Sequence, residues 1–478
     1  MTALIDLVPE GWFTFHTLGS ALGLLVYAIG SHTLAQRRHP AAAFSWVLLI
    51  VLAPEAGVPA YLFFGTRKLP KAQRLPGAVQ ATGHDPAPPS ADVAPHWVQK
   101  LTAAMSLPPA AGYRALRVHA DGVQAHAALL EIVDGARHRL DVCTFILGRD
   151  RFGDALLERL AARARAGVQV RLMVDGVGTW MGGRRDFSVA THAGVRVARF
   201  MPPLRSPLRW WVRGRTNLRN HRKMVVADGV RLWSGGRNLA GEYFEGRDGE
   251  PAWADLSFDL EGDVAGQALA LFDSDWTAAR SAAALDALET RRPWPQGPVS
   301  APAAQLLASG PDYADDTVHS VLLTSCYRAR GRILAVTPYL VPDESLLAAL
   351  AMAARRGVTV DILLPERSNH VLADIARNRP MRELAAAGVR LWLAPAMLHA
   401  KAVVVDEHMA MVGSVNLDSR SLFLNFELMT AFYHPGDIAR FTGWIDAHVA
   451  AARRYRADRA SLARHVGEGL VLWLAFQL

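Results

Sequence analysis

The chain has 478 residues, a formal net charge of +8 and a hydrophobic content of 51%. Because domains typically contain roughly 100 to 200 residues, this length allows two domains with cores of their own plus an additional segment. The positive charge favours an anionic partner, which is either a nucleic acid or an acidic lipid surface. The only two cysteines, Cys143 and Cys326, lie in apolar stretches, which argues against a disulfide framework and against a cysteine-based zinc site.

The amino-terminal region predicts a helical hairpin in a membrane. Residues 11 to 36 include no Asp, Glu, Lys or Arg, and a helix needs roughly 20 apolar residues to cross the hydrocarbon core. A second apolar run, residues 41 to 65, is interrupted by Pro54, Glu55 and Pro59. We expect transmembrane segments over 12–34 and 42–64, within a membrane region 1–69. The alternative for the second run is a kinked helix lying partly in the interface.

The charges around these two runs bear on targeting and orientation. A secretory signal peptide is rejected, because the residues before position 11 carry Asp6 and Glu10 but no Lys or Arg. The positive-inside rule favours a cytoplasmic location for the rest of the chain, because the larger basic cluster follows the second run. Arg37, Arg38 and His39 lie between the runs, and Arg67, Lys68, Lys71 and Arg74 follow them.

The remainder of the chain indicates a duplicated α/β fold. After a Pro- and Ala-rich linker (70–112), strand-like runs such as RLDVCTFIL alternate with helix-like runs such as GDALLERLAARARAG. The same order returns after a second linker (291–303), where RILAVTPYL echoes the first strand. We therefore expect a first lobe over 113–290 and a second over 304–478, related by a pseudo-twofold axis.

One pattern occurs in both lobes with identical spacing. In each lobe a His is followed by Lys two residues on, Asp seven on, Gly fourteen on and Asn seventeen on. The positions are His221, Lys223, Asp228, Gly235 and Asn238 in the first lobe, and His399, Lys401, Asp406, Gly413 and Asn416 in the second. A lone His is more often a structural residue, but two copies of a five-residue pattern indicate a shared site.

The pattern also predicts local structure. Spacing two on a strand puts His and Lys on one face. Asp228-Gly229 is typical of a two-residue hairpin turn. Such a turn would place Gly236 opposite His221, where a small residue leaves room for a phosphate, and by the same count Ser414 opposite His399. Asp228 and Asp406 lie at the turns. We expect their main role to be shaping the site, and proton transfer to be secondary to it.

These residue types suit exchange at a phosphodiester. The negative charge of the phosphate must be neutralised, here by Lys223, Lys401, Asn238 and Asn416. One imidazole can then attack phosphorus while the other protonates the leaving alkoxide. A carboxylate is expected beside each imidazole, and Glu427 and Asp255 are the candidates. The lysines replace a metal ion in this scheme, so we expect neither a metal nor a cofactor.

At this point the sequence resembles a known family. The duplicated HxKxxxxDxxxxxxGxxN pattern resembles the phospholipase D superfamily, and RNHRK, GGRNLAGEYF and GSVNLDSRSLFLNFE resemble bacterial cardiolipin synthases over nearly the whole chain. The resemblance implies condensation of two phosphatidylglycerol molecules into cardiolipin and glycerol through a phosphatidyl-histidine. It implies His221 as nucleophile and His399 as acid and base, although pseudo-symmetry allows the reverse. It also implies a multi-pass protein of the bacterial inner membrane, with phosphatidylglycerol and the bilayer as partners and no nucleic acid.

Other readings of the same residues remain open. A phospholipase D, or a phosphatidyltransferase that uses another lipid such as phosphatidylethanolamine, would carry the same motifs. A nuclease of the superfamily fits the charge but not the hairpin, and a non-enzymatic scaffold does not explain two intact motifs. A series of arginines with two tryptophans either binds an acidic lipid headgroup or forms a solvated loop; its members are Arg205, Arg209, Arg213, Arg215 and Arg219 with Trp210 and Trp211. The apolar tail 469–478 either contacts the bilayer or closes the hydrophobic core.

Overall fold

The computed structural model describes the chain in ranges. These are residues 12–33, 40–65, 67–68, 94–183, 185–201, 217–246, 249–280, 302–458, 461, 464, 467–469 and 471. Several expectations from the sequence therefore lie outside the described residues: the basic positions 37–39, 71 and 74, the arginine and tryptophan stretch 205–215, nearly all of the linker 291–303, and the tail beyond 471.

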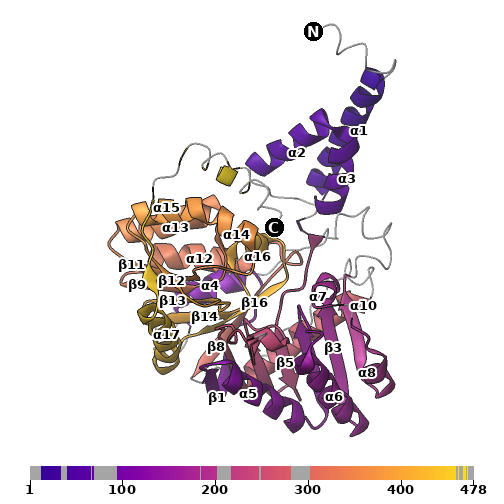
Figure 1. Ribbon diagram of the computed structural model, residues 1–478, viewed down its shortest axis with the longest axis vertical. Helices are drawn as coiled ribbons and strands as arrows, with labels where there is room; N and C mark the ends of the chain where they lie inside the picture. Colours follow the sequence, from indigo (N-terminus) through magenta and orange to yellow (C-terminus); the bar gives the residue numbers. More distant parts are fainter. Residues whose placement is uncertain are drawn as a thin grey trace, which may run out of the picture.

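Among the described residues, three helices precede the body of the molecule and project from it (Figure 1). They are α1 (Trp12–Thr33), α2 (Pro40–Leu52) and α3 (Pro54–Phe64). Within the described residues, α1 is the one helix long and apolar enough to cross a membrane, over Thr14–Ser31. The expected second membrane segment is not one continuous helix, because the chain breaks at Ala53 and Pro54 opens α3.

The break has a local explanation. A proline has no N–H to continue a helix, so carbonyl groups at the end of α2 need other partners. His16 Nε2 lies 3.0 Å from the Val51 carbonyl oxygen, and the Ser20 hydroxyl donates to the same oxygen at 3.3 Å. Polar side chains of α1 thus contact the interruption, which keeps α2 and α3 packed against α1.

In the part of the chain that the structure describes, the body is built on one sheet of fifteen strands. The order is β17-β12-β11-β9-β13-β14-β16-β8-β1-β7-β6-β5-β2-β3-β4. The first lobe contributes β1 (Ala111–His119), β2 (Arg139–Thr144), β3 (Gln169–Asp175), β4 (Arg196–Phe200), β5 (Met224–Ala227), β6 (Arg231–Gly235) and β7 (Ser257–Gly262). The second contributes β8 (Ala303–Ser309), β9 (Arg332–Val336), β11 (Thr359–Pro365), β12 (Arg390–Ala394), β13 (Ala402–Val405), β14 (Met409–Gly413), β16 (Glu427–Phe432) and β17 (Arg453–Arg454).

The strand order reads alike in both directions from the β1–β8 pair. Outward from β1 come β7, β6, β5, β2, β3 and β4, and outward from β8 come β16, β14, β13, β9, β11 and β12. The equivalent neighbours also match in direction: β2 and β3 are parallel, as are β9 and β11. The expected α/β fold of two related lobes is confirmed, and the lobes share a single mixed sheet. A separate two-stranded pair is formed by β10 (Leu340–Val341) and β15 (Leu417–Asp418).

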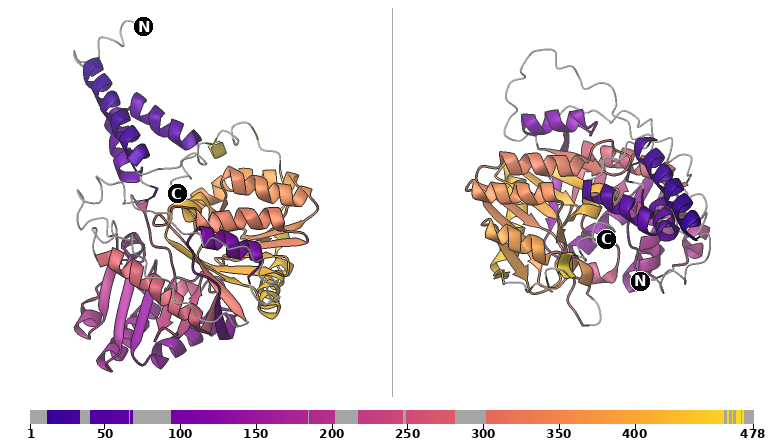
Figure 2. Two further views of the ribbon diagram at one scale, coloured as in Figure 1. Left: turned by 180° about the vertical axis from the view of Figure 1, so that it is seen from behind. Right: turned by 90° about the horizontal axis from the view of Figure 1, so that it is seen from above.

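Helices cover the sheet on both faces (Figures 1 and 2). The first lobe has α4 (His96–Ala104), α5 (Gly122–Gly135), α6 (Arg151–Arg165), α7 (Gly176–Met181), α8 (Ser188–His192), the 3-10 helix η3 (Gly241–Tyr243) and α10 (Asp263–Arg280). The second has α12 (Thr317–Arg328), α13 (Glu344–Arg355), α14 (Val371–Ala376), α15 (Asn378–Ala386), α16 (Ser419–Phe423) and α17 (Pro435–Ala450).

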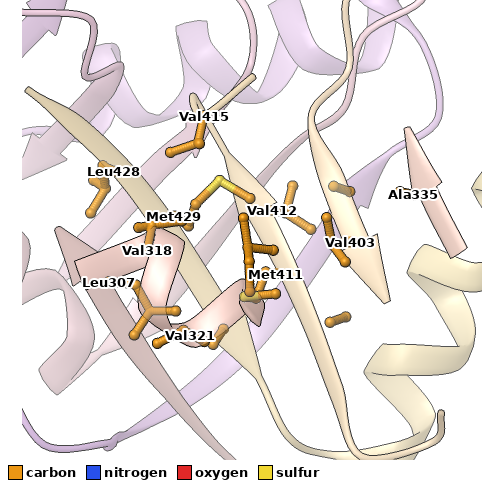
Figure 3. Close-up of a cluster of buried hydrophobic side chains, with 14 of the residues drawn as sticks. Leu307, Val318, Val321, Ala335, Val403, Met411, Val412, Val415, Leu428 and Met429 are labelled. Atoms are coloured by element: carbon orange, nitrogen blue, oxygen red, sulfur yellow. The ribbon is translucent and has the colours of Figure 1, made fainter. Parts of the chain in front are cut away.

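Burial on both faces explains why the strands read as nearly continuous apolar runs. In β5, Met224 and Val226 face the core shared by both lobes, while Val225 and Ala227 face a second core under α5 and α6. The shared core continues through the second lobe, where α12 packs on the sheet through Val318 and Val321 (Figure 3). Both cysteines are buried and unpaired, as expected.

The two motif hairpins differ from the sequence prediction by one residue. Ala227 pairs with Arg231, and Val405 with Met409, so each turn has three residues instead of two. Asp228 and Asp406 open the turns with left-handed backbone angles (φ +54° and +50°). The third turn residue, Val230 or His408, has no register partner in the opposite strand and forms a bulge. The prediction that Gly236 lies opposite His221 and Ser414 opposite His399 is therefore wrong. The strands also begin at Met224 and Ala402, just after each Lys.

Candidate active site

The two His-x-Lys segments lie where the lobes join, and each is paired with backbone of the other lobe. The His221 N–H donates to the Phe426 carbonyl at 2.8 Å, and the His399 N–H donates to the Ala254 carbonyl at 2.7 Å. Phe426 and Ala254 each stand one residue before a carboxylate, Glu427 and Asp255. This crossed pairing brings each carboxylate to the histidine of the opposite lobe.

The carboxylates contact the histidines directly. His221 Nδ1 lies 2.9 and 3.0 Å from the two carboxylate oxygens of Glu427, and His399 Nδ1 lies 2.7 Å from Asp255 Oδ2. Both carboxylates are fully buried, and the side chain of His221 is 13% exposed. A carboxylate on Nδ1 holds the neutral imidazole with its proton on that atom and leaves Nε2 unprotonated. Nε2 is then the atom available for chemistry at phosphorus.

The lysines lie beside the imidazoles. Lys223 Nζ donates to the His221 carbonyl oxygen at 2.7 Å, and Lys401 Nζ donates to the His399 carbonyl oxygen. Lys401 also lies against the ring of its histidine, with Nζ 2.6 Å from Nδ1 and 3.0 Å from Nε2. Both lysines are 1% exposed, so two amino groups are held in a site with little water.

Burial shifts the charges of these groups. Loss of water lowers the pKa of Lys401 to about 7 and that of Lys223 to about 8. Burial, reinforced by Lys401 and Lys223, lowers the pKa of His399 to about 3 despite Asp255. The pKa of His221 is lowered for the same reasons, although Glu427 opposes the shift. Since each histidine is affected by both lysines, the two motifs form one electrostatic unit. At neutral pH both imidazoles are neutral in the free protein.

Two small residues, each directly after the motif glycine, lie beside the carboxylates. A Cβ atom on Gly236 would come within 2.2 Å of Asp255 Oδ1. At the equivalent position the Ser414 hydroxyl donates to Glu427 Oε2 at 2.5 Å. These residues therefore fix the position of the carboxylate that holds each histidine. The predicted two-residue turn had placed them opposite the histidines instead.

The two asparagines donate to hydroxyl groups in their own lobes. Asn238 Nδ2 donates to the Tyr243 hydroxyl at 2.7 Å, and Asn416 Nδ2 donates to the Ser421 hydroxyl at 3.2 Å. The ring of Tyr243 packs edge-on against His399 across the lobe junction, with 5.0 Å between ring centroids. Sequence reasoning missed Tyr243 and Ser421, although each follows its asparagine by five residues, a repeat that could have revealed them.

The structure does not bring Asp228 and Asp406 together with the histidines. The Asp228 carboxylate accepts backbone N–H bonds from residues 137, 138 and 139 at 2.8 to 2.9 Å, at the start of β2. Asp406 accepts the same three bonds from residues 330, 331 and 332, at the start of β9. These donors lower the pKa of both carboxylates against the effect of burial. Both aspartates thus hold the turn end of their hairpin to the start of a neighbouring strand.

A further residue of the first motif contacts the site from behind. Arg222 is fully buried, and its guanidinium binds Asp275 at 2.5 and 2.7 Å. Its Nε donates to the carbonyl oxygen of Glu427 at 3.0 Å. In the second lobe Ala400 stands at this position, so the contact exists in one lobe alone. The described residues contain no group of three or more His, Cys, Asp or Glu that could hold a metal ion.

Comparison with known proteins agrees with this arrangement. A duplicated α/β fold with one His-x-Lys motif in each lobe defines the class of phospholipase D-like proteins. Residues 129–276 and 322–449 match the family described as "Cardiolipin synthase, PLD-like domain". The chain belongs to this cardiolipin synthase family of phospholipase D-type phosphatidyltransferases.

Relatives and solved structures are consistent with that membership. Cardiolipin synthase A of Citrobacter koseri is 32% identical over 435 residues, which cover 87% of this chain and 89% of that protein. Cardiolipin synthase A of Erwinia tasmaniensis is 31% identical over 469 residues, 93% of this chain and 95% of that protein. The crystal structure of phosphatidylserine synthase from Haemophilus influenzae has a TM-score of 0.61 and covers 80% of this chain and 100% of that chain. At 12% sequence identity, this last likeness concerns the fold alone.

Proposed function

We propose that this chain condenses two phosphatidylglycerol molecules into cardiolipin and glycerol. In the first half-reaction the Nε2 atom of His221 attacks the phosphorus of one lipid, and glycerol leaves with a proton from His399. In the second, His399 takes the proton from a hydroxyl of the other lipid's glycerol headgroup, and the resulting oxygen displaces His221 from phosphorus. Atoms and charge balance, because the proton given in the first step is recovered in the second.

The crossed histidine–carboxylate pairs are the observation that carries this proposal. Each Nε2 is left unprotonated by a carboxylate on Nδ1, which suits a nucleophile. The acid must instead be protonated, and the low pKa of His399 opposes this in the free protein. A bound phosphodiester adds negative charge beside both imidazoles and so raises their pKa values. Substrate binding thereby prepares the acid only when there is a bond to cleave.

The other predicted residues complete the site. Lys223 and Lys401 bind the non-bridging oxygens, where their charge stabilises the transition state. Asn238 and Asn416 position these oxygens with their hydroxyl partners, and Gly236 and Ser414 fix the carboxylates. Asp228 and Asp406 act on the site through the hairpins that they brace.

We also propose a location in the bacterial inner membrane. In this arrangement α1 crosses the bilayer, and α2 and α3 form the return segment of a hairpin, with the catalytic lobes on the cytoplasmic side. The helix break at Pro54 and the contacts of His16 and Ser20 support a return segment that is kinked within the bilayer. The division into a membrane region 1–69, a linker 70–112, lobes 113–290 and 304–478 and a linker 291–303 belongs to the same proposal.

Mass spectrometry of lipid products tests the function. The full chain in vesicles of phosphatidylglycerol alone should form equal amounts of cardiolipin and glycerol, and His221→Ala and His399→Ala should each form at least ~10⁴-fold less. Vesicles that also contain phosphatidylethanolamine provide the control for another donor. Product that requires the second lipid, or that is mainly phosphatidic acid, would contradict the named substrate while leaving the site chemistry intact.

A further inference from the structure

We propose that the two lobes contact the bilayer through a surface of their own, separate from the amino-terminal helices. It consists of Trp180 and Met181 on α7 and Val371 and Leu372 on α14, and we call it the docking rim. The partner is the headgroup and upper acyl region of an anionic bilayer. The proposal adds to the proposed function, which needs a bilayer lipid to reach the histidines.

Exposure of these four apolar side chains is the first observation. Trp180 is 67% exposed, Met181 60%, Val371 72% and Leu372 41%. A tryptophan is rarely left this exposed on a soluble surface, since its ring offers a large apolar area. Here it lies next to a second exposed apolar residue, and the same pairing occurs on α14. Adjacent exposed apolar pairs differ from the single exposed residues that ordinary surfaces carry.

Helix α7, which carries Trp180 and Met181, is connected to the first motif by hydrogen bonds. Asp175 ends β3, and one of its carboxylate oxygens accepts the N–H groups of Val177 and Gly178, which starts α7. The other oxygen accepts the N–H of Asn220 at 2.9 Å, the residue directly before His221. One carboxylate thus ties the base of α7 to the segment that carries the histidine.

The position of α14 is equivalent in the second lobe. It follows β11, which runs parallel to β9, while β13 runs antiparallel to β9. The carboxyl end of β11 therefore lies at the edge of the sheet where β13 begins, directly after Lys401. Since β3 and β11 occupy equivalent places in the strand order, the two pairs flank the shared site from opposite lobes. Both helices lie at the end of their lobe nearer α1 to α3 (Figure 1).

The connection to the membrane region agrees with a lipid partner. Directly after α3, Arg67 and Lys68 bind Asp316 at the start of α12, at 2.7 and 2.9 Å. This contact holds the second lobe close to the last helix of the membrane region. Trp favours the headgroup level of a bilayer and aliphatic residues favour the acyl boundary. The exposed Arg149 and Arg367, beside α7 and before α14, add positive charge that suits anionic lipid.

Turnover of two forms of substrate tests the docking rim. The full chain and the variant Trp180→Ser/Val371→Ser are compared on phosphatidylglycerol in vesicles and on a monomeric short-chain phosphatidylglycerol. We expect the variant to lose about tenfold of vesicle turnover, from the reduced apolar contact, and to keep short-chain turnover within about twofold. The matched control is Val230→Ser/Met352→Ser. Val230 and Met352 are 53% and 46% exposed, and Val230 lies at the turn end of β5, away from the site.

A second measurement does not depend on the reaction. In vesicles with brominated acyl chains, we expect the fluorescence that Trp180 contributes, obtained as the difference between the chain and Trp180→Phe, to be quenched by the bromine. Quenching by aqueous iodide instead, as for a rim exposed to water, or quenching by neither agent, as for a rim covered by a protein partner, would overturn the proposal. An equal loss of vesicle and short-chain turnover would do so as well, since it indicates damage to the fold. If no cardiolipin forms but bromine quenches Trp180, the proposed function fails and the docking rim stands.

Discussion

The two half-sites carry the same motif but differ in what surrounds it. In the half-site of His221, the glutamate carboxylate is held by Ser414 and by Asn425, whose side chain donates to it at 3.1 Å. In the half-site of His399, the aspartate carboxylate accepts the Leu256 N–H at 2.7 Å and is closed in by Gly236. The longer glutamate side chain is therefore held by hydrogen-bond donors, whereas the shorter aspartate side chain is packed against a glycine. The motif is the same in both half-sites, and the surrounding residues make its two environments unequal.

The two half-sites also differ at their lysines and at the residue between His and Lys. Lys401 lies against the ring of its histidine, and burial lowers the pKa of both lysines, to about 7 for Lys401 and about 8 for Lys223. Arg222 ties the first motif to Glu427 and Asp275, while Ala400 makes no side-chain polar contact. The comparison teaches that a duplicated motif can take two roles, because opposite tasks require different pKa values and different rigidity.

The largest effect should separate the roles of the histidines. In His399→Ala the first half-reaction lacks its acid and the second its base, so the phosphatidyl group should form slowly on His221 and then persist, whereas in His221→Ala no covalent lipid should form. Mass spectrometry of the intact protein after prolonged exposure to phosphatidylglycerol measures the adduct. Adduct in His221→Ala and none in His399→Ala would reverse the assignment.

Substitution of the small residues should have unequal effects on the two half-sites. Gly236→Ala should lower kcat about 100-fold, because the new Cβ displaces Asp255 from His399. Ser414→Ala removes one hydrogen bond to Glu427 and should lower kcat by only about fivefold. Steady-state rates of cardiolipin formation measure both. Equal losses would show that the carboxylates are held alike in the two half-sites.

Arg222 should contribute separately to stability and to rate. Arg222→Met leaves Asp275 buried without its ion pair and should reduce the free energy of unfolding by roughly 3 to 5 kcal/mol. Arg222→Met/Asp275→Leu should recover most of that loss, as measured by denaturant unfolding, but should keep a kcat about tenfold low, because the bond to the Glu427 carbonyl is still missing. A double variant with full activity would limit Arg222 to a structural role.

The lysines should set the alkaline limit of activity. A lysine loses its charge as the pH rises through its pKa, so kcat/KM should fall between about pH 7 and pH 8, where Lys401 and Lys223 titrate. The limit for kcat should lie at higher pH, because bound phosphodiester raises both values. Lys401→Arg keeps its charge and should move the limit for kcat/KM upward by up to about one unit. A pH profile unchanged by this substitution would assign the limit to another group.

The sequence was informative where a repeat or a hydrophobic pattern carried the signal. The duplicated lobes followed from echoed strands, the motif residues were found by their spacing, and the two carboxylates were named as candidates from their residue type. The crossing of the carboxylates was not predictable, because it depends on the pairing of Phe426 and Ala254 with the opposite lobe. The turn length was missed because Asp228 and Asp406 favour a tight turn, yet each strand continues only after one more residue. Arg222 was missed because its partners come from three separate segments.

The crossed carboxylates have a consequence for how such a chain can evolve. In a dimer of identical single lobes, both half-sites would be encoded by one gene, and any change in the carboxylate or its neighbour would appear twice. Joining the lobes in one chain removes that constraint, so Glu427 with Ser414 and Asp255 with Gly236 can diverge as independent pairs. Each lobe then depends on the other for the residue that holds its histidine. Neither lobe can be lost or exchanged without disabling its partner.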